Sequence, residues 1–262
     1  MRFSDKVVLI TGGGTGIGKA TAICFAKEGG KIAICGRREK VLKETVAEIA
    51  KSGGEATYFV CNVAESSLVN KLVQDTVDKY GRIDILFNNA GIMNSNPIEE
   101  TTDEDINQLF DINVKGEFWA LRAVIRQMRK QGSGGAIINM SSVSGLVGEL
   151  NTAGYCATKG AISNLTRAVA MEVARDNIRV NAVCPGVIYT PMFEEGLRED
   201  PTIVRGFMDS TPMKRVASPE EVAKVVLFLA SDDASFVTAV NLPVDGGYSA
   251  CNGYIGGDAD VT

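Results

Sequence analysis

The stretch from Thr11 to Gly18 reads TGGGTGIG. It follows directly on the apolar, β-branched run Lys6–Thr11 and leads into a helical pattern that continues to about Lys27. Glycines permit a tight turn and close approach of a ligand to the backbone, and the helix that follows offers free N–H groups to a phosphate. The spacing is G-x-x-x-G-x-G, not the G-x-G-x-x-G of the usual dinucleotide fingerprint, although the physical requirements are shared. A strand, a glycine turn and a helix in this order indicate a dinucleotide-binding unit.

Short β-rich runs alternate with amphipathic stretches along almost the whole chain. The predicted strands are Lys6–Thr11, Lys31–Cys35, Glu55–Cys61, Asp84–Phe87, Ala136–Met140, Ile178–Cys184 and Ala239–Val244. The predicted helices after the first are Glu39–Lys51, Ser66–Tyr80, a long one over about 103–130, Thr152–Arg175 and Pro219–Leu229. This alternation implies right-handed crossovers between parallel strands. We therefore predict an α/β fold: a Rossmann-like, doubly wound domain with a seven-stranded parallel sheet and helices on both faces.

The chain shows no Pro/Ser-rich linker, so we expect residues 1–250 to form a single dinucleotide-binding domain. The segment 186–215 differs from the rest because it combines three prolines, mixed charge and large apolar residues just after a strand. Long excursions of this kind are often lids or binding loops, which predicts a substrate loop. Residues 251–262, rich in glycine and aspartate, are expected to form a flexible tail.

The composition excludes several classes of function. The 262 residues include no histidine, so no Ser-His-Asp or Cys-His apparatus is possible. The six cysteines lack C-x-x-C spacing, and we expect no metal site. A net charge of −5 disfavours nucleic-acid binding. The longest apolar runs are strand-length, and the opening MRFSDKVVLITGGG lacks the features of a signal peptide, so we expect a cytoplasmic protein without a membrane span.

The end of the second predicted strand bears on the choice of dinucleotide. An acidic residue about twenty positions after the glycine turn usually binds the ribose hydroxyls of NAD, but here the chain reads Gly36-Arg37-Arg38. Two guanidinium groups suit the 2′-phosphate of NADP better than a bare ribose. The alternative is that both arginines are merely solvated at a helix start. The pattern favours NADP(H), with NAD(H) still possible.

Tyr155 and Lys159 stand four residues apart in GYCATKG, residues 154–160. On a helix they project from one face, about 5–6 Å apart. A nearby ammonium stabilises a phenolate, which makes a tyrosine a usable acid or base near neutral pH. The spacing alone is common on helix surfaces. However, the polar segments Asn139–Ser142 and Asn88–Gly91 follow the fifth and fourth predicted strands, at the edge where open α/β sheets bind ligands.

Together these motifs resemble the classical short-chain dehydrogenase/reductase family. The resemblance covers the chain from Lys6 to Gly247. TGGGTGIG matches the family's T-G-x-x-x-G-x-G, NNAG at 88–91 matches N-N-A-G, and YCATK at 155–159 matches Y-x-x-x-K. Pro185-Gly186 matches the P-G after the sixth strand, and VDGG at 244–247 is similar to the closing strand and turn.

The resemblance implies hydride transfer between a nicotinamide cofactor and a secondary alcohol or ketone. It implies that Tyr155 exchanges a proton with the substrate oxygen, and that a serine thirteen residues earlier, Ser142 and not Ser141, hydrogen-bonds that oxygen. Lys159 is expected to bind the nicotinamide ribose, and Asn113 to hold a water that links the lysine to solvent. The expected catalytic set is Asn113, Ser142, Tyr155 and Lys159.

The resemblance also implies which residues surround the ligands. The expected cofactor contacts are Gly12, Thr15, Gly16, Ile17, Gly18, Arg37, Arg38, Asn62, Val63, Asn89, Ala90, Gly91, Tyr155, Lys159, Pro185, Gly186, Ile188 and Thr190. The expected substrate contacts are Met93, Ser144, Glu149, Met192, Phe193, Phe207 and Met208. Three positions depart from the family pattern: Asn62 stands where Asp is frequent, Thr15 where many NADP users carry Arg or Lys, and Ala239 in place of the glycine of S-x-x-x-T-G.

Three functions stay open. The apolar side chains of 186–215 favour a bulky apolar substrate such as a hydroxysteroid, unless they only anchor the loop or an oligomer contact. The alternative is a 3-oxoacyl-acyl-carrier-protein reductase, for which a basic helix face would receive the acidic carrier, unless that face is plain surface. The basic residues concerned are Arg122, Arg126, Arg129 and Lys130. A non-catalytic dinucleotide sensor is disfavoured because the four catalytic residues are all present.

The family is usually homotetrameric. We therefore expect four copies to pack through the helices at about 103–130 and 152–175 and through the closing strand.

Overall fold

Seven parallel strands form a single sheet in the order β3-β2-β1-β4-β5-β6-β7. The computed structural model describes residues 1–194 and 202–250, so the predicted tail at 251–262 lies outside the described residues. The strands are β1 (Val7–Thr11), β2 (Lys31–Gly36), β3 (Glu55–Val60), β4 (Ile85–Asn88), β5 (Gly135–Met140), β6 (Ile178–Pro185) and β7 (Asn241–Val244). All seven predicted strands are present, with ends within two residues of the prediction.

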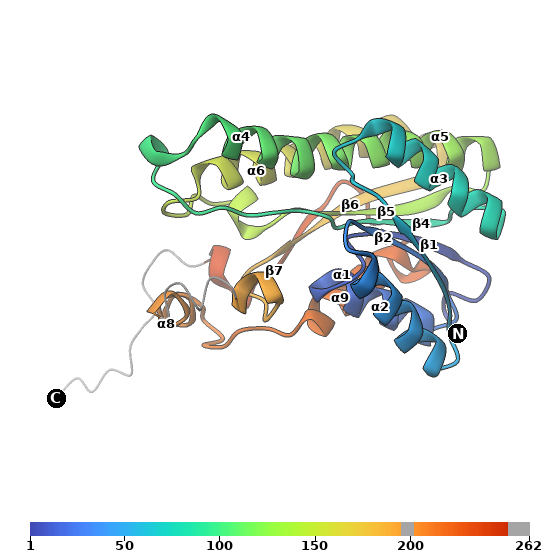
Figure 1. The fold of residues 1–262 in the computed structure, drawn as a ribbon, viewed down its shortest axis with the longest axis horizontal. Helices are drawn as coiled ribbons and strands as arrows, with labels where there is room; N and C mark the ends of the chain where they lie inside the picture. The colour runs from blue at the N-terminus through green and yellow to red at the C-terminus, as the bar shows by residue number, and fades with distance from the viewer. Residues whose placement is uncertain (195–201, 251–262) are drawn as a thin grey trace.

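The central strands are apolar on both sides because helices cover both faces of the sheet. Successive side chains of a strand point to opposite faces, so Val8 and Ile10 of β1 join one core while Leu9 joins the other. The first core is covered by α1 (Gly16–Lys27), α2 (Glu39–Lys51) and α9 (Pro219–Ala230). The second is covered by α3 (Ser66–Tyr80), α5 (Glu117–Gln131) and α6 (Ala153–Val173). Figure 1 shows the two helical layers on either side of the sheet. The predicted doubly wound α/β fold is confirmed.

The strand order places the switch point of the sheet between β1 and β4. The chain runs outward from β1 through β2 to β3 and then returns to pair β4 against β1, with Val8 opposite Ile85. Ligands of open α/β sheets bind outside the carboxyl ends of the strands at such a point. The glycine turn follows β1 and the NNAG segment follows β4, so both predicted motifs lie at this point.

The long helix predicted over about 103–130 is present, but one segment of it is π-helical instead of α-helical. It consists of α4 (Asp103–Leu109), a π-helical turn η2 (Phe110–Gly116) and α5. The π-helical segment contains Asn113, which is fully buried and whose amide bonds to the backbone of Ile92. A π turn carries an extra residue compared with an α turn and often occurs at functional sites. The local sequence keeps helical periodicity throughout, so it does not reveal the change from α to π hydrogen bonding.

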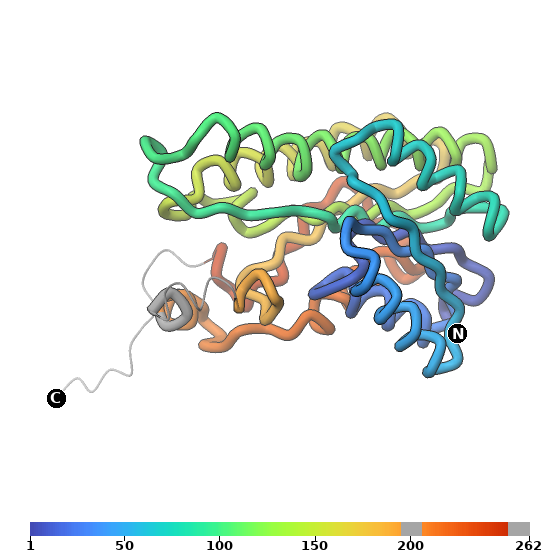
Figure 2. Tube along the Cα trace, viewed as in Figure 1, coloured from blue at the N-terminus to red at the C-terminus, as the bar shows by residue number. Residues whose placement is uncertain are grey.

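The predicted substrate loop at 186–215 has structure of its own. Ile188 forms a parallel bridge with Ala217, and α8 (Thr202–Ser210) follows. Residues 195–201 lie outside the described part, and in the tube view the described residues on either side of them lie at the end of the molecule away from the N-terminus (Figure 2). The remaining short helices are η1 (Ile98–Glu100), η3 (Val143–Gly145), η4 (Ala174–Asp176), η5 (Asp232–Ala234) and η6 (Tyr248–Ala250). Within the described part of the chain, every helix is too short or too polar to cross a membrane.

Candidate functional site

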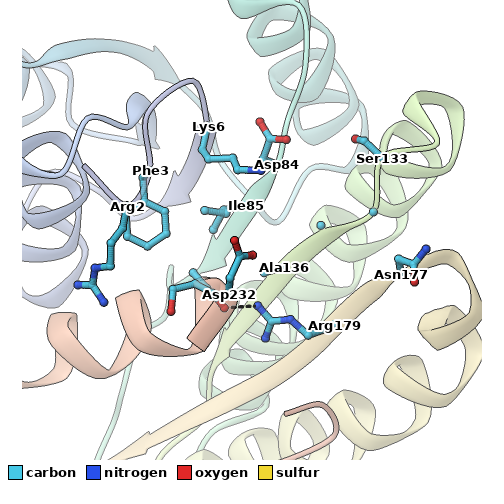
Figure 3. A pocket seen from close by; sticks show the side chains of 14 residues that line it. Arg2, Phe3, Lys6, Asp84, Ile85, Ser133, Ala136, Asn177, Arg179 and Asp232 are labelled. Atoms are coloured by element: carbon cyan, nitrogen blue, oxygen red, sulfur yellow. Dashed lines mark hydrogen bonds between the residues drawn. The ribbon is translucent and has the colours of Figure 1, made fainter. Parts of the chain in front are cut away.

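The two ends of the sheet carry different polar groups. At the amino ends of β1, β4, β5 and β6, a hollow is lined by residues that include Lys6, Asp84 and Arg179 (Figure 3). The carboxylate of Asp84 accepts hydrogen bonds from the backbone N–H of Val7 and from the guanidinium of Arg82. Arg179 donates to backbone carbonyls, including that of Leu229. The predicted site residues lie at the other end of the strands.

The glycine turn after β1 brings two backbones into contact. A Cβ at Gly18 would lie only 2.3 Å from the carbonyl oxygen of Gly12, so a larger residue is excluded there. Gly12 has φ +68°, in the left-handed region that favours glycine. A Cβ at Gly16 would lie 3.3 Å from the methyl group of Thr190, which brings the segment after β6 against this turn. The structure thus places Thr190 beside the glycine turn, as expected.

The start of α1 is open toward an anion. Its N-cap residue is Thr15, and among the described residues no side chain caps the helix start. The first turn contains no acidic residue, so the helix dipole is not neutralised there. Free N–H groups behind a glycine turn suit a pyrophosphate. The close contacts at Gly12 and Gly18 leave no room for a larger side chain at these two positions. The residues present therefore fit a dinucleotide, and Gly12 and Thr15–Gly18 are the residues that would hold its phosphates.

Thr11 ties this turn to the NNAG segment. Its hydroxyl accepts hydrogen bonds from the backbone N–H groups of Asn89 at 2.9 Å and Ala90 at 3.0 Å. The side-chain amide of Asn89 donates in return to the carbonyl oxygens of Thr11 and Gly12. Asn89 and Ala90 are thereby locked against the glycine turn, as a shared ligand-binding edge requires.

Asn113 connects the NNAG segment to α6. Its side-chain oxygen accepts from the N–H of Ile92 and its amide donates to the carbonyl of Ile92, both at 2.8 Å. The same amide donates to the hydroxyl of Thr158 at 3.2 Å. A Cβ at Gly91 would lie 3.2 Å from the Asn113 oxygen and 3.5 Å from Lys159 Nζ. Gly91, Asn113 and Lys159 therefore meet at one point.

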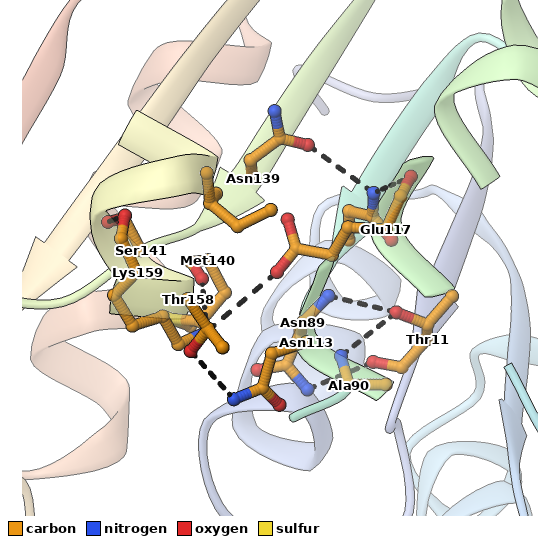
Figure 4. A network of polar contacts seen from close by, with 12 residues as sticks. Thr11, Asn89, Ala90, Asn113, Glu117, Asn139, Met140, Ser141, Thr158 and Lys159 are labelled. Carbon is orange, nitrogen blue, oxygen red and sulfur yellow. Dashed lines mark hydrogen bonds and ion pairs between the residues drawn. The ribbon is translucent and has the colours of Figure 1, made fainter. Parts of the chain in front are cut away.

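Lys159 is buried, with 2 % of its surface exposed. Its Nζ donates to the carbonyl oxygen of Met140 at 2.6 Å and lies 5.7 Å from the centre of the Tyr155 ring. It also lies 3.8 Å from a carboxylate oxygen of Glu117, the first residue of α5 (Figure 4). Burial in low dielectric strengthens the action of this ammonium on its neighbours. The predicted pairing of Tyr155 and Lys159 on one helix face is present.

Ser142 is the N-cap residue of η3, which packs against α6. A Cβ at Gly145 in η3 would lie 2.6 Å from the carbonyl oxygen of Lys159. The Ser142 hydroxyl accepts from the backbone N–H of Ser144 and lies 3.1 Å from its hydroxyl. By contrast, Ser141 donates to the Lys159 carbonyl and bonds Ser163. Ser141 is thus used to hold α6, which is consistent with Ser142 as the chemically available serine.

The expected adenosine contacts lie at the ends of β2 and β3. Arg37 and Arg38 are exposed and follow directly on Gly36. Val63 is buried, and a Cβ at Gly116 would lie 2.9 Å from one of its methyl groups. The side-chain oxygen of Asn62, another expected cofactor contact, accepts the N–H of Ala64 at 3.3 Å.

The chain beyond β6 holds the remaining expected cofactor contacts. Pro185 ends β6, and the N–H of Gly186 bonds the carbonyl of Val244 at 3.2 Å. A Cβ at Gly186 would lie 3.0 Å from the backbone of Asp245, so only glycine fits comfortably there. Ile188 is buried. This part of the chain is fixed against β7 before it reaches the glycine turn.

The expected substrate contacts form two groups. Ser144 is buried and donates to the carboxylate of Glu149, while Phe207 of α8 lies 6.4 Å from the ring of Tyr248. Burial raises the pKa of the Tyr248 phenol, and the negative charge of Glu149 adds to this rise, which places the two side chains close together. The apolar members are more exposed; they are Met93, Met192, Phe193 and Met208.

The sequence did not single out two residues that lie close to the expected site residues, Tyr248 and Glu117. Tyr248 follows a glycine pair, and nothing in its spacing predicts that it lies close to Phe207 and Glu149. Glu117 did carry a signal, because it heads the stripe Glu117, Leu121, Val124 and Met128, whose other members are apolar and buried. An acidic residue on the buried face of a helix indicates a special environment.

Chemically, this edge combines a proton donor, a neutral hydroxyl and a fixed ammonium. Tyr155 can exchange a proton, Ser142 can donate a hydrogen bond to an oxygen, and Lys159 can hold hydroxyl groups. A nicotinamide ring, when bound, supplies or accepts a hydride.

Comparisons with known proteins agree with this geometry. The family model described as enoyl-(acyl carrier protein) reductase matches residues 12–249. Levodione reductase of Leifsonia aquatica is 42% identical over 257 residues, covering 95% of this chain and 96% of that protein. Cyclopentanol dehydrogenase of a Comamonas species is 42% identical over 249 residues, covering 95% and 99%. A 3-oxoacyl-[acyl-carrier-protein] reductase of Thermotoga maritima is 40% identical over 250 residues, covering 94% and 99%.

Solved structures show the same likeness. The crystal structure of levodione reductase has a TM-score of 0.92 and 41% identity, covering 95% of this chain and 100% of that one. NAD+-bound xylitol dehydrogenase has a TM-score of 0.91 and 39% identity, covering 94% and 100%. The chain therefore belongs to the classical short-chain dehydrogenase/reductase family of oxidoreductases, whose members use a nicotinamide cofactor.

Proposed function

We propose that the protein transfers a hydride reversibly between a nicotinamide dinucleotide and a secondary alcohol or ketone, with Asn113, Ser142, Tyr155 and Lys159 as catalytic residues. The observation that carries this proposal is the buried Lys159, held by the Met140 carbonyl and lying 5.7 Å from the Tyr155 ring. Burying an ammonium group is energetically unfavourable, so such a group is expected to have a compensating partner or a functional role. The position of Lys159 beside Tyr155 favours a role in acid–base chemistry.

In this proposal Tyr155 gives its proton to the carbonyl oxygen during reduction and takes it back during oxidation. Ser142 donates a hydrogen bond to the same oxygen and stabilises the negative charge that develops on it during reduction. Lys159 stabilises the phenolate and would hold the nicotinamide ribose. Asn113 fixes the π turn against Ile92, and we propose that it holds the water between Lys159 and solvent.

For the substrate, we propose a secondary alcohol or ketone with an apolar, ring-shaped body. The apolar side chains of Met192, Phe193, Phe207 and Met208 support an apolar substrate. The relatives named for levodione and cyclopentanol support a ring. A hydroxysteroid, the substrate first expected, is the bulkiest member of this class. The hydroxyl of Ser144 and the carboxylate of Glu149 would face its polar groups.

A 3-oxoacyl-acyl-carrier-protein reductase is the second candidate, and the relative of that name supports it. The basic helix face that would receive a carrier protein gives it little support. Arg122 lies over the Trp119 ring and bonds Ser66, and Arg129 pairs with Asp176. With these two side chains engaged, the face offers less positive charge to a partner. A non-catalytic sensor is the third candidate, disfavoured by the complete catalytic set.

A substrate screen separates these candidates. Cyclopentanol, cyclohexanol, a 3-hydroxysteroid and, in the reverse direction, an acetoacetyl thioester would each be offered with both dinucleotides. We expect the highest kcat/KM with a ring alcohol. The highest value with the thioester would favour the second candidate, and no turnover with any of them would favour the sensor.

For the cofactor, we propose NADP(H), with NAD(H) possible. Gly36 stands where an NAD enzyme places a carboxylate, and exposed Arg37 follows it. A guanidinium at this place suits the 2′-phosphate. The NAD+-bound xylitol dehydrogenase shows that a protein of this fold can bind the other dinucleotide, so the preference depends on Arg37.

We further propose a single-domain, cytoplasmic protein that assembles as a homotetramer through α4 to α6 and β7. Phe118 on α5 and Met171 on α6 are 44% and 81% exposed, which supports burial of these helices by other copies. Light scattering at micromolar concentration should give four times the chain mass of 27.9 kDa. A single 27.9 kDa species would refute the assembly.

A further inference from the structure

Glu117 is a buried carboxyl group that the proposed reaction does not use. Only 1 % of it is exposed, and neither carboxylate oxygen has a hydrogen-bond partner among the described residues. One oxygen lies 3.8 Å from Nζ of Lys159, closer than any other charged group acting on it but longer than a hydrogen bond (Figure 4). Burying an unpaired carboxylate is unfavourable, so its retention on an otherwise apolar stripe calls for a reason.

Among the residues that the structure describes, Lys159 is the charged group that acts on Glu117. Asn88 and Asn139 reach this region from β4 and β5 as neutral amides, and Asn88 bonds the backbone carbonyl of Glu117 at 2.9 Å. Cys184 of β6 and Tyr155 of α6 are further titratable groups close to Lys159. The ion pair on η2, between Asp111 and Lys115, is exposed to solvent.

The charge of Glu117 changes within a useful range of pH. Burial raises the pKa of Glu117 to about 8, and the attraction of the Lys159 ammonium offsets only part of that rise. Below this pH the carboxyl group is neutral and the full charge of Lys159 acts on Tyr155. Above it the carboxylate is ionised and cancels part of that charge.

We propose that Glu117 is a positioning residue that acts on the tyrosine through Lys159: its carboxylate weakens the pull of the ammonium on the phenolic proton at alkaline pH. Tyr155 then keeps the proton that ketone reduction requires to a higher pH. This inference rests on the proposed roles of Tyr155 and Lys159. Glu117 touches neither substrate nor cofactor in it.

The first experiment compares pH profiles of kcat/KM for ketone reduction. In Glu117→Gln the alkaline limb should move to lower pH by at least about half a unit, while the acid limb stays in place because the wild-type carboxyl is neutral there. Glu117→Leu, which leaves no buried polar group, should give the same shift if the Gln variant folds poorly. Glu117→Asp keeps an ionisable group and should restore much of the alkaline limb.

The matched control is Glu221→Gln, at the start of α9 and away from the site. The pKa of Glu221 is lowered to about 2, chiefly by Arg215, so this carboxylate stays ionised over the whole profile. Its variant should leave both limbs unchanged. An alkaline limb that is the same in wild type, Glu117→Gln and Glu117→Leu would overturn the proposal.

The second experiment uses the protein without cofactor or substrate. Between pH 4.5 and about 8 folded Glu117 holds a proton that the unfolded chain has lost, so it lowers stability increasingly as pH rises. The Tm of Glu117→Gln minus that of wild type should therefore rise by at least about 3 °C from pH 5.5 to pH 8.5. The same difference for Glu221→Gln should stay constant. A constant difference for Glu117→Gln as well would overturn the titration.

The two experiments separate this inference from the proposed function. If Tyr155 proves dispensable for turnover, the proposed function fails, while the Tm experiment still reports the titration of Glu117. If the Tm difference rises but the alkaline limb stays in place, Glu117 titrates without acting on the reaction, and the inference is overturned.

Discussion

The two edges of the sheet bury acidic residues in opposite ways. At the amino edge, Asp84 accepts a hydrogen bond of 2.9 Å from the Val7 N–H and pairs with Arg82, so its charge is fully used within the protein. At the carboxyl edge, Glu117 lies 3.8 Å from Lys159 and neither of its oxygens has a hydrogen-bond partner among the described residues. A satisfied buried charge stabilises the fold, whereas an incompletely paired one can respond to pH or to a ligand.

The difference extends to the backbone around each edge. At the amino edge Gln131 bonds both the N–H and the carbonyl of Ile83, which closes the start of β4. At the carboxyl edge the corresponding device is Asn113, which bonds both groups of Ile92 but does so from a π turn beside Lys159. The same chemistry closes one edge of the sheet and shapes a site at the other. Variants at the two edges should therefore separate stability from activity.

The largest effect is expected from Tyr155→Phe. It removes the transferable proton and should lower kcat by about 10³-fold or more, with dinucleotide affinity nearly unchanged. Steady-state kinetics and fluorescence titration with NADPH measure the two quantities. Tyr80→Phe is the matched control, because Tyr80 lies on α3 and bonds the carbonyl of Ile32. Near-normal turnover in Tyr155→Phe would contradict the proposed mechanism.

The second effect concerns the cofactor. Arg37→Ala should raise KM for NADPH by about tenfold to a hundredfold, because one charge-assisted contact to the 2′-phosphate is lost. KM for NADH should change little. Arg126→Ala, which removes an exposed arginine from α5, serves as the control. A wild-type enzyme that prefers NADH, or equal damage with both dinucleotides, would show that Arg37 does not recognise the phosphate.

The third effect tests the amino edge. Asp84→Asn should lower the free energy of unfolding by about 2 kcal/mol, because it leaves Arg82 without its partner near buried backbone. Tm should fall by about 4–8 °C for a chain of this size. Below the transition, kcat should equal that of wild type, since the site is at the other edge. If Asp84→Asn left the stability unchanged, or if it lost activity while remaining stable, the proposed division between a stabilising edge and a functional edge would be wrong.

The smallest effect is expected from Glu221→Gln, at neither edge. Glu221 accepts from the N–H of Ser218 in a capping box and pairs with Arg215, and these contacts lower its pKa to about 2. Tm should fall by about 2–4 °C at pH 7. A carboxyl with a lowered pKa stabilises above its unfolded value of 4.5, so the difference should vanish as pH falls toward 2. A difference that persists at pH 2 would contradict this origin.

Much of the fold was predictable because its signals are local. Apolar β-branched runs and helical periodicity follow from burial on one or both faces, and they located all seven strands. Glycines are required wherever two backbones meet, as at Gly12 and Gly18, so the dinucleotide turn is visible in the sequence. The spacing of Tyr155 and Lys159 follows from the helix itself.

The tertiary structure alone decided what depends on distant partners. The π-helical segment η2 contains Asn113, which bonds Ile92 in another segment, while the local periodicity of 103–130 predicts a helix without distinguishing α from π hydrogen bonding. The hydroxyl of Ser141 is engaged because α6 brings Lys159 and Ser163 to it. The pKa of Glu117 is raised only because packing buries its carboxyl group, and the nearby Lys159 offsets part of that rise. Sequence periodicity indicates which side of an element is buried. It does not indicate which polar group a buried side chain will contact, because such contacts form only when remote segments pack.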